Sequence, residues 1–179
     1  SQRGFLRYLT ELMEEQKNKA KFFTSPDNRK SKKYASSIRP YIIRQHFKRF
    51  PNLQQEVIFY YDTDIIFREL PDFDSMIAGE EWYVSDTRNY LDSNYIKSSG
   101  SNELFMEMRE CVGIEKKVVE DNDVNCGGAQ YLLKNKTIAF WEKVEKDCEG
   151  LYELMQSNNN RQAEKEYIQN KKSYVIHYY

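Results

Sequence analysis

The stretch Val57-Ile-Phe-Tyr-Tyr61, followed directly by Asp62-Thr-Asp64, decides how we interpret this chain. Five consecutive apolar or aromatic residues, β-branched at the start, predict a strand that is covered on both faces. Burying a carboxylate is costly, so two carboxylates at the end of such a strand call for a physical reason. Residues two apart in an extended chain point to the same side, so we expect Asp62 and Asp64 to converge.

Convergent carboxylates at the end of a strand suit a hard divalent cation such as Mg2+ or Mn2+. Open α/β sheets also bind their ligands at the carboxyl ends of their strands. The alternative is an Asx turn, in which one of the two aspartates caps the segment that follows. Because the pair ends an apolar strand, we favour a metal site over the turn.

Upstream of this strand the sequence predicts two helices joined by a polar loop. Apolar residues at steps of three and four indicate an amphipathic helix from Gly4 to Phe23. Residues 24–33 are polar and rich in turn formers, and they carry basic side chains that a phosphate could contact (Arg29, Lys30, Lys32 and Lys33). The second helix covers Tyr34 to Phe50, where Pro40 marks either a kink or a first turn.

Downstream, strands and helices continue to alternate, which predicts a single α/β domain over residues 1–179. The predicted elements are a strand over Trp82–Ser85, a helix from Ser101 to Cys111, a glycine turn at 125–130 followed by the apolar Tyr131–Leu133, a helix from Thr137 to Gln156, a polar break at 157–160 and a strand-like ending at 174–179.

The composition is that of a folded globular protein, with 40% hydrophobic and 31% charged residues. The 27 Lys and Arg nearly balance the 28 Asp and Glu, which argues against a general nucleic-acid binder. No apolar run approaches the roughly 20 residues needed to span a bilayer. Three cysteines are an odd count without metal-ligand spacing, so we expect a reducing, cytoplasmic location.

Several motifs give the chain a family resemblance. The segment Phe59-Tyr-Tyr-Asp-Thr-Asp-Ile-Ile66 resembles the Asp-x-Asp segment of nucleotide-sugar glycosyltransferases with the A-type fold. Asn125-Cys-Gly-Gly-Ala-Gln-Tyr131 resembles the Asn-x-Gly strand and turn that lines the sugar pocket there. Together with Ser85-Asp-Thr87, the glycine segment is similar to uncharacterised bacteriophage glycosyltransferase-like proteins. The resemblance covers roughly residues 34–141.

The resemblance implies a Rossmann-like mixed sheet flanked by helices. It also implies an enzyme that moves a sugar from a nucleotide-diphosphate donor to an acceptor, which would be a glycan, a protein or modified DNA. The cell would be a microbe or a phage-infected host. The family fold opens with a strand, and none precedes Phe5. Either the first strand or strands are missing from this chain, or the resemblance is partial.

The resemblance also assigns metal ligands. In the family, the acids that match Asp62 and Asp64 hold Mn2+ or Mg2+, which bridges the donor diphosphate. A late histidine often completes that metal site, and Val175-Ile-His-Tyr178 resembles its surroundings, so His177 is a candidate third ligand. The alternative is a structural role for His177, which is common for a histidine near a chain end.

The remaining candidate residues would bind the donor or act in the transfer. Glycines allow close approach of a sugar, and the resemblance places Asn125, Gly127, Gly128 and Gln130 along the sugar pocket. Arg39 would grip a phosphate through a bidentate fork. Asp86 would bind a sugar hydroxyl or act as the base of an inverting transfer, and its alternative role is to cap a turn.

Two other functions stay open. Asp62-Thr-Asp64 resembles the nucleophile and acid of haloacid-dehalogenase-type phosphohydrolases, and Ser85 resembles their phosphate-binding serine. Residue 66 is Ile, however, where that motif prefers Thr or Val, and its later acidic motif does not follow. The second alternative is a non-catalytic binding or virion-associated protein on the same fold, because fold alone does not determine function.

Overall fold

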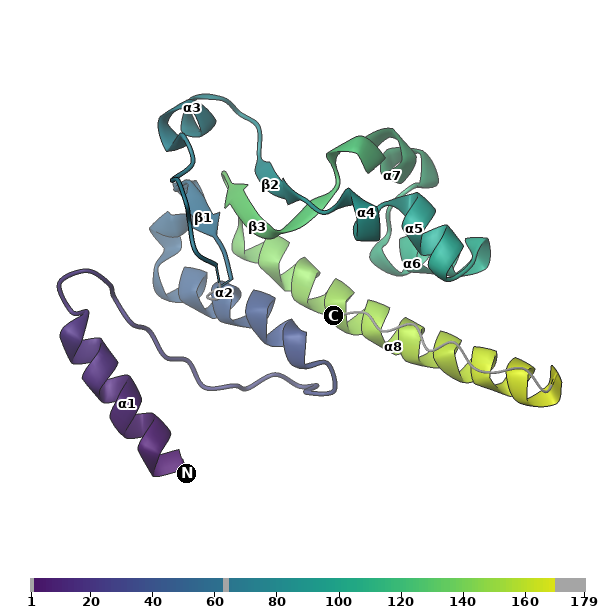
Figure 1. Ribbon diagram of the computed structural model, residues 1–179, viewed down its shortest axis with the longest axis horizontal. Coiled ribbons are helices and arrows are strands. Elements are labelled where there is room, and N and C mark those ends of the chain that lie inside the picture. The colour runs from purple at the N-terminus through teal and green to yellow at the C-terminus, as the bar shows by residue number, and fades with distance from the viewer. Residues whose placement is uncertain (1, 63–64, 170–179) are drawn as a thin grey trace.

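A small antiparallel sheet lies over two long helices in the computed structural model, which describes residues 2–62 and 65–169 (Figure 1). The strands are β1 (Ile58–Tyr60), β2 (Tyr83–Asp86) and β3 (Gly127–Leu133), in the order β1-β3-β2. Residues 58–60 of the apolar run form β1, which confirms a strand there. The prediction that the run is covered on both faces is wrong, because β1 lies at the edge of the described sheet, its residues are half-buried, and Val57 and Tyr61 are exposed. The prediction of a mixed sheet is wrong for the described residues, because β3 separates β1 from β2 and runs antiparallel to both.

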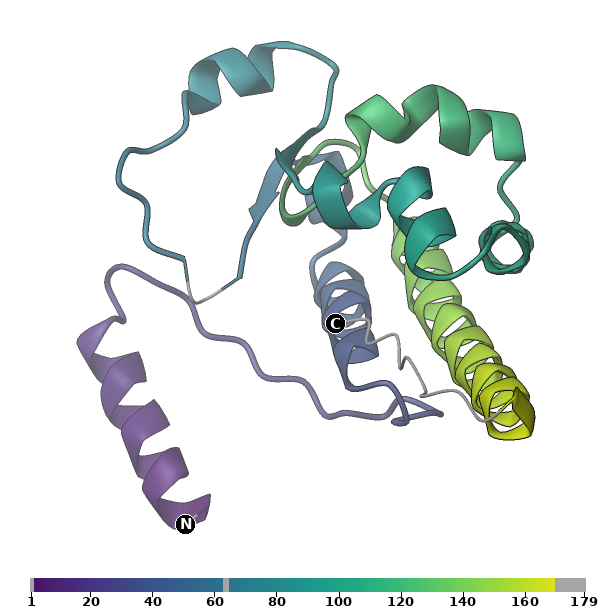
Figure 2. The same ribbon diagram turned by 45° about the vertical axis from the view of Figure 1, so that its right-hand side comes forward.

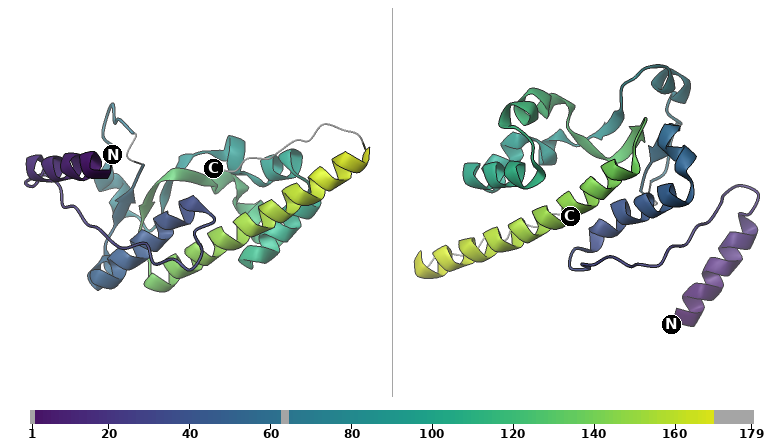
Figure 3. Two further views of the ribbon diagram at one scale, coloured as in Figure 1. Left: turned by 90° about the horizontal axis from the view of Figure 1, so that it is seen from below. Right: turned by 180° about the vertical axis from the view of Figure 1, so that it is seen from behind.

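The main core lies between this sheet and the helices α2 (Ile38–Arg49) and α8 (Ile138–Gln169). The two helices pack against each other beneath the sheet (Figure 3). Phe47 of α2, Leu133 of β3 and Trp141 of α8 are buried in contact with one another. Burying side chains of this size supplies the principal stabilisation of such a layered arrangement.

Pro40 was predicted to mark either a kink in a helix or the first turn of one, and the structure shows the second. A short 3-10 turn, η1 (Ala35–Ser37), precedes the helix, and Pro40 lies in the first turn of α2. Proline is well accommodated there because its missing N–H would have no helical partner. A second 3-10 turn, η2 (Pro51–Gln55), follows α2 and leads into β1.

Helix α8 continues where the sequence predicted a break. Residues 157–160 stay helical, and the side chain of Asn158 is buried. Helix α6 (Asn102–Val112) packs alongside α8, and Arg161 of α8 donates two hydrogen bonds to Glu107 of α6, at 3.0 and 2.6 Å. This packing outweighs the weak helical preference of the asparagines.

The helix predicted from Ser101 to Cys111 is confirmed as α6. The Leu104 N–H donates to Ser101 Oγ at 3.0 Å, and Gly113 ends the helix at a left-handed φ of 69°. Four short helices were not predicted, and they are α3 (Phe73–Ala78), α4 (Arg88–Leu91), α5 (Ser93–Ser99) and α7 (Lys116–Asn122). A 3-10 turn, η3 (Asp123–Asn125), then leads to β3.

Helix α1 (Gln2–Glu15) is shorter than the predicted helix over Gly4–Phe23 and lies apart from the other elements (Figure 2). The chain from there to η1 runs along α2 without regular structure. The predicted strand at 174–179 falls outside the described residues. Within the described part of the chain, every helix is too short or too polar to cross a membrane.

Candidate functional site

An ion pair between two separate elements marks the candidate site. Asp62 directly follows β1, and Arg39 lies in the first turn of α2. Arg39 Nη1 is 3.3 Å from Asp62 Oδ1, and the two side chains are 56% and 26% exposed. An exposed guanidinium carries five N–H donors, so this one ion pair with a described residue leaves other donors of Arg39 able to bind an anion.

We call the place where the start of α2 meets the end of β1 the corner, and two tyrosines form its inner wall. Tyr60 of β1 is paired in register with Tyr131 of β3, and their ring centroids are 6.1 Å apart. Burial raises the pKa of both phenols. The charges of Arg39 and Asp62 act on both tyrosines, which shows that the four side chains share one electrostatic environment.

The paired glycines lie within β3 rather than in a turn before it. Register shifts between Val84 and Ser85, so that Ser85 pairs with Gly128 while Val84 pairs with Tyr131. The extra residues form a β-bulge, in which Ala129 has a φ of 65°. Ser85 Oγ bridges the bulge, donating to the Gly128 carbonyl and accepting from the Gln130 N–H.

Each glycine has a packing reason to be small. A Cβ at Gly127 would lie well inside van der Waals contact of the Ser85 carbonyl oxygen and Val84 Cγ2. At Gly128 a Cβ would lie 3.1 Å from Leu91 Cδ1 and 3.3 Å from Tyr131 Oη. Gly128 therefore brings the backbone of the bulge close to the Tyr131 hydroxyl, and so to the tyrosine wall.

Of the other sugar-pocket candidates, Asn125 lies before the bulge and Gln130 lies within it. Asn125 is exposed at the end of η3, before β3 begins. Gln130 is half-buried on β3, next to Tyr131 in sequence. Side chains next to each other on a strand point to opposite faces, so Gln130 and Tyr131 do not extend the same surface.

Asp86 is engaged by its own neighbour. Arg88 Nε and Nη2 donate to the two carboxylate oxygens of Asp86 at 2.9 and 2.6 Å. The Arg88 side chain, and then the Arg88 N–H, lower the pKa of Asp86 to about 2. The Arg88 N–H donates to Asp86 Oδ1 at 3.2 Å, so Asp86 also makes the turn contact that was its alternative role.

The predicted metal site is described only in part. Asp62 lies at the corner, whereas Asp64 and His177 lie outside the described residues. Residues 2–62 and 65–169 contain no group of three His, Cys, Asp or Glu side chains arranged to hold a metal ion. Asp62 offers carboxylate oxygens of the kind that Mg2+ and Mn2+ prefer, and Arg39 occupies one of them.

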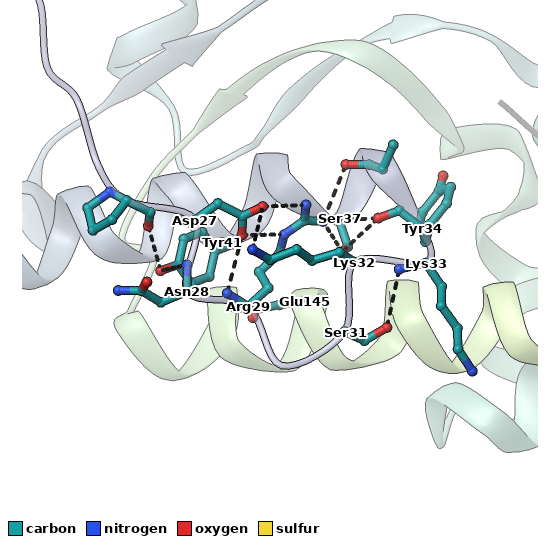
Figure 4. A network of polar contacts seen from close by, with 12 residues as sticks. Asp27, Asn28, Arg29, Ser31, Lys32, Lys33, Tyr34, Ser37, Tyr41 and Glu145 are labelled. Carbon is teal, nitrogen blue, oxygen red and sulfur yellow. Dashed lines mark hydrogen bonds and ion pairs between the residues drawn. The ribbon is translucent and has the colours of Figure 1, made fainter.

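The basic loop contains one residue with a different role (Figure 4). The Arg29 side chain is only 6% exposed. Its Nε and Nη2 donate to the carboxylate of Asp27 at 2.9 and 3.0 Å, and its Nη1 donates to Ser37 Oγ at 2.8 Å. These bonds fasten the loop to the start of α2, so Arg29 is a structural residue and is not available to a phosphate.

Tyr131 and Ser85 are the residues at this corner whose part we had not predicted. Tyr131 was treated as the start of an apolar strand, and only its pairing with Tyr60 brings it to Arg39 and Asp62. Ser85 was considered only as a phosphate contact, whereas here its hydroxyl stabilises the bulge.

In chemical terms, the corner combines an anion-binding guanidinium, a carboxylate, two aromatic hydroxyls and a backbone bulge held open by glycine. Such a set can bind a phosphorylated ligand and orient its hydroxyl groups. Searches against protein-family models, curated proteins and solved structures found no match to this chain.

Proposed function

We propose that the chain is a glycosyltransferase that binds a nucleotide-diphosphate sugar at the corner formed by Arg39, Asp62 and the β3 bulge. The observation that supports this most is the 3.3 Å approach of Arg39 to Asp62, because it joins a phosphate-binding group to the Asp-x-Asp segment. The exposed fraction of Arg39 leaves its remaining N–H groups available to the diphosphate.

Asp62 and Asp64 would hold Mn2+ or Mg2+ beside the diphosphate. When bound, the ion would neutralise charge that develops on the departing nucleotide diphosphate. Arg39 would turn from Asp62 to the phosphates and share that role. The backbone at Gly127 and Gly128 would approach the sugar, with Asn125 offering an amide group to its hydroxyls, whereas Gln130 faces away from the Tyr131 side of β3 and would not take part.

Asp86 fits a binding role better than that of a base. A carboxyl group whose pKa is about 2 is a poor proton acceptor near neutral pH. Its Arg88 partner also occupies both carboxylate oxygens. We therefore propose that Asp86 binds a sugar hydroxyl as an ionised acceptor, or positions the bulge, which follows the regular pairs Asp86–Gly127 and Ser85–Gly128.

The state of Asp86 also favours a second candidate, a binding protein that uses the same corner without catalysis. An acid neutralised by a neighbouring arginine leaves the described part of the corner without an evident base. Such a protein would bind the nucleotide sugar and release it unchanged. In that case the protein would attach to the sugar-bearing ligand and would not transfer the sugar to an acceptor.

The test is isothermal titration of UDP and GDP into the full chain, in Mn2+ and in EDTA. We expect metal-dependent binding that is lost in Asp64→Ala and weakened at least tenfold in Asp62→Asn and Arg39→Gln. Asp74→Asn, which changes an exposed acid of α3, is the matched control. Equal binding by Asp62→Asn and Asp74→Asn would refute the proposed site.

Incubation with UDP-sugars then separates the two candidates. Release of free UDP, whether by transfer or by slow hydrolysis, supports the enzyme. Metal-dependent binding without any UDP release supports the binding protein. Release of phosphate from p-nitrophenyl phosphate would instead support the phosphohydrolase, which no feature of the corner favours over the other two.

A further inference from the structure

Helix α1 is an amphipathic helix whose apolar face is exposed. On this face Phe5, Leu6 and Met13 are 62%, 55% and 38% exposed, which is high for side chains of this size, and Leu9 and Leu12 are partly exposed. The ion pairs Arg7–Glu11 and Lys17–Glu14 both lie within residues 7–17, so they do not connect α1 to the core. Figures 1 and 2 both show α1 apart from the sheet and from α2.

Such a helix needs a partner to be stable. A helix of 14 residues is marginal in water by itself, because tertiary packing supplies most helical stability in proteins. The charges of α1 make this worse. It has no acidic residue in its first turn and no basic residue in its last turn, so its charges do not compensate the helix dipole.

The apolar residues of α1 are symmetric about Leu9. Phe5 and Met13 lie four residues to either side, and Leu6 and Leu12 lie three residues to either side. At 100° per residue, all of these positions fall within about 60° of Leu9 around the helix. Two copies that pair antiparallel with Leu9 at the centre would therefore place the larger Phe5 opposite the slimmer Met13.

The charges have the opposite symmetry. Basic residues precede Leu9 in the sequence of α1 and acidic residues follow it. Antiparallel pairing places the basic half of one helix beside the acidic half of the other, whereas parallel pairing places like charges together. It also places each C-terminal end beside the N-terminal end of the other helix, which compensates both dipoles.

We propose that α1 is a dimerisation helix that pairs antiparallel with α1 of a second copy of this chain, centred on Leu9. The surface is distinct from the Arg39 corner, so the dimer does not depend on the proposed function. Two helices about 21 Å long bury a modest area, so we expect a dissociation constant on the order of 10 µM.

The first test is sedimentation equilibrium of the full chain from about 1 to 300 µM, a range that brackets the expected constant. We expect a monomer–dimer equilibrium, with dimerisation weakened at least tenfold in Leu9→Glu. Arg7→Lys, which keeps the charge on the opposite face of α1, should dimerise like the parent. Because α1 lies apart from the core, both variants should keep the parent melting temperature.

Register is tested by disulfide formation in a Cys111→Ser background, which removes the exposed thiol. Leu9→Cys should form linked dimers on mild oxidation, and Arg7→Cys should form at least tenfold fewer. A monomer at all concentrations would overturn the proposal, as would equal linkage by the two cysteines. Co-sedimentation of a monomer with phosphatidylglycerol vesicles would assign α1 to a membrane surface instead.

Discussion

Two arginine–aspartate pairs in this chain differ in almost everything except chemistry. Arg29 is buried and is bound by Asp27, by Ser37 and by the carbonyl of Tyr34. Arg39 is more than half exposed and contacts Asp62 once, at 3.3 Å. A guanidinium with its donors satisfied stabilises structure, whereas one with donors to spare can bind a ligand. An arginine in this chain can therefore bind a ligand when some of its N–H donors have no partner in the folded protein.

Arg29→Met gives the largest expected loss of stability, about 2–3 kcal/mol in the free energy of unfolding. It removes the hydrogen bonds to Asp27, Tyr34 and Ser37, and it leaves the Ser37 side chain fully buried with fewer partners. Urea denaturation of the variant and the parent measures this difference. A loss below about 0.5 kcal/mol, the size typical of a surface pair, would mean that Arg29 is no more structural than Arg39.

Gly127→Ala tests the sheet corner in the same way, with an expected loss of about 2 kcal/mol. The new Cβ would press on the backbone of Ser85 and force β2 away from β3. Gly128→Ala is the matched control, because its Cβ would lie 3.1 Å from Leu91 Cδ1 and 3.3 Å from Tyr131 Oη, tight contacts that a small shift of side-chain atoms relieves. Thermal unfolding should therefore rank Gly127→Ala well below Gly128→Ala, and the reverse order would contradict the observed register.

Acid should reduce the stability that the Asp27–Arg29 pair contributes to the folded protein. Hydrogen bonds from Arg29 lower the pKa of Asp27 from 3.8 to about 2, so the folded state favours the ionised carboxylate. A lowered pKa stabilises the protein above about pH 4, and that contribution is lost as pH falls from about 4 to about 2. The measurement is urea unfolding of the parent and Asp27→Asn over this range. Parallel pH profiles for the two proteins would show that Asp27 does not contribute.

Arg39→Gln should have the smallest effect on stability, below about 0.5 kcal/mol. The pair with Asp62 is exposed and makes a single contact, so solvent screens it strongly. Its stability contribution should also disappear in 1 M NaCl. A loss above about 1.5 kcal/mol would place Arg39 with Arg29 among the structural residues and would weaken the proposed ligand site.

Sequence patterns predicted what depends on local residues. Residues 58–60 of the run at 57–61 became β1 because continuous apolar residues of this kind suit a strand wherever it is paired. The start of the helix predicted from Ser101 was correct because capping is decided within one turn of helix. For the same reason, local sequence limited the role of Pro40 to a helix kink or the first turn of a helix.

Other features depend on partners far away in the chain. Gly127 and Gly128 predicted a turn, and only pairing with Ser85 shows that they belong to a bulged strand. Asn158 suggested a break, yet burial in the folded chain keeps its segment helical. Arg29 looks like the lysines next to it in sequence, and its burial alone separates it from them.

The candidate site was predicted in outline rather than in detail. Arg39 and Asp62, which were expected to bind phosphate and metal, lie 3.3 Å apart, and those binding roles stay predictions. The pairing of Asp86 with Arg88 joins residues only two apart in the chain, but Arg88 was not among the predicted site residues. The role of Tyr131 needed the register of β1 on β3, which no local pattern specifies.

The central strand of the sheet is the last of the three to be synthesised. Strands β1 and β2 lie on either side of β3, so neither has its neighbour until residues 127–133 have left the ribosome. The nascent chain must therefore keep two apolar strand segments unpaired while the intervening helices form. Such long-range closure slows folding and exposes strand edges to other chains. We expect assembly of the sheet to be the slow step in biogenesis, and the period before it to be when a chaperone matters most.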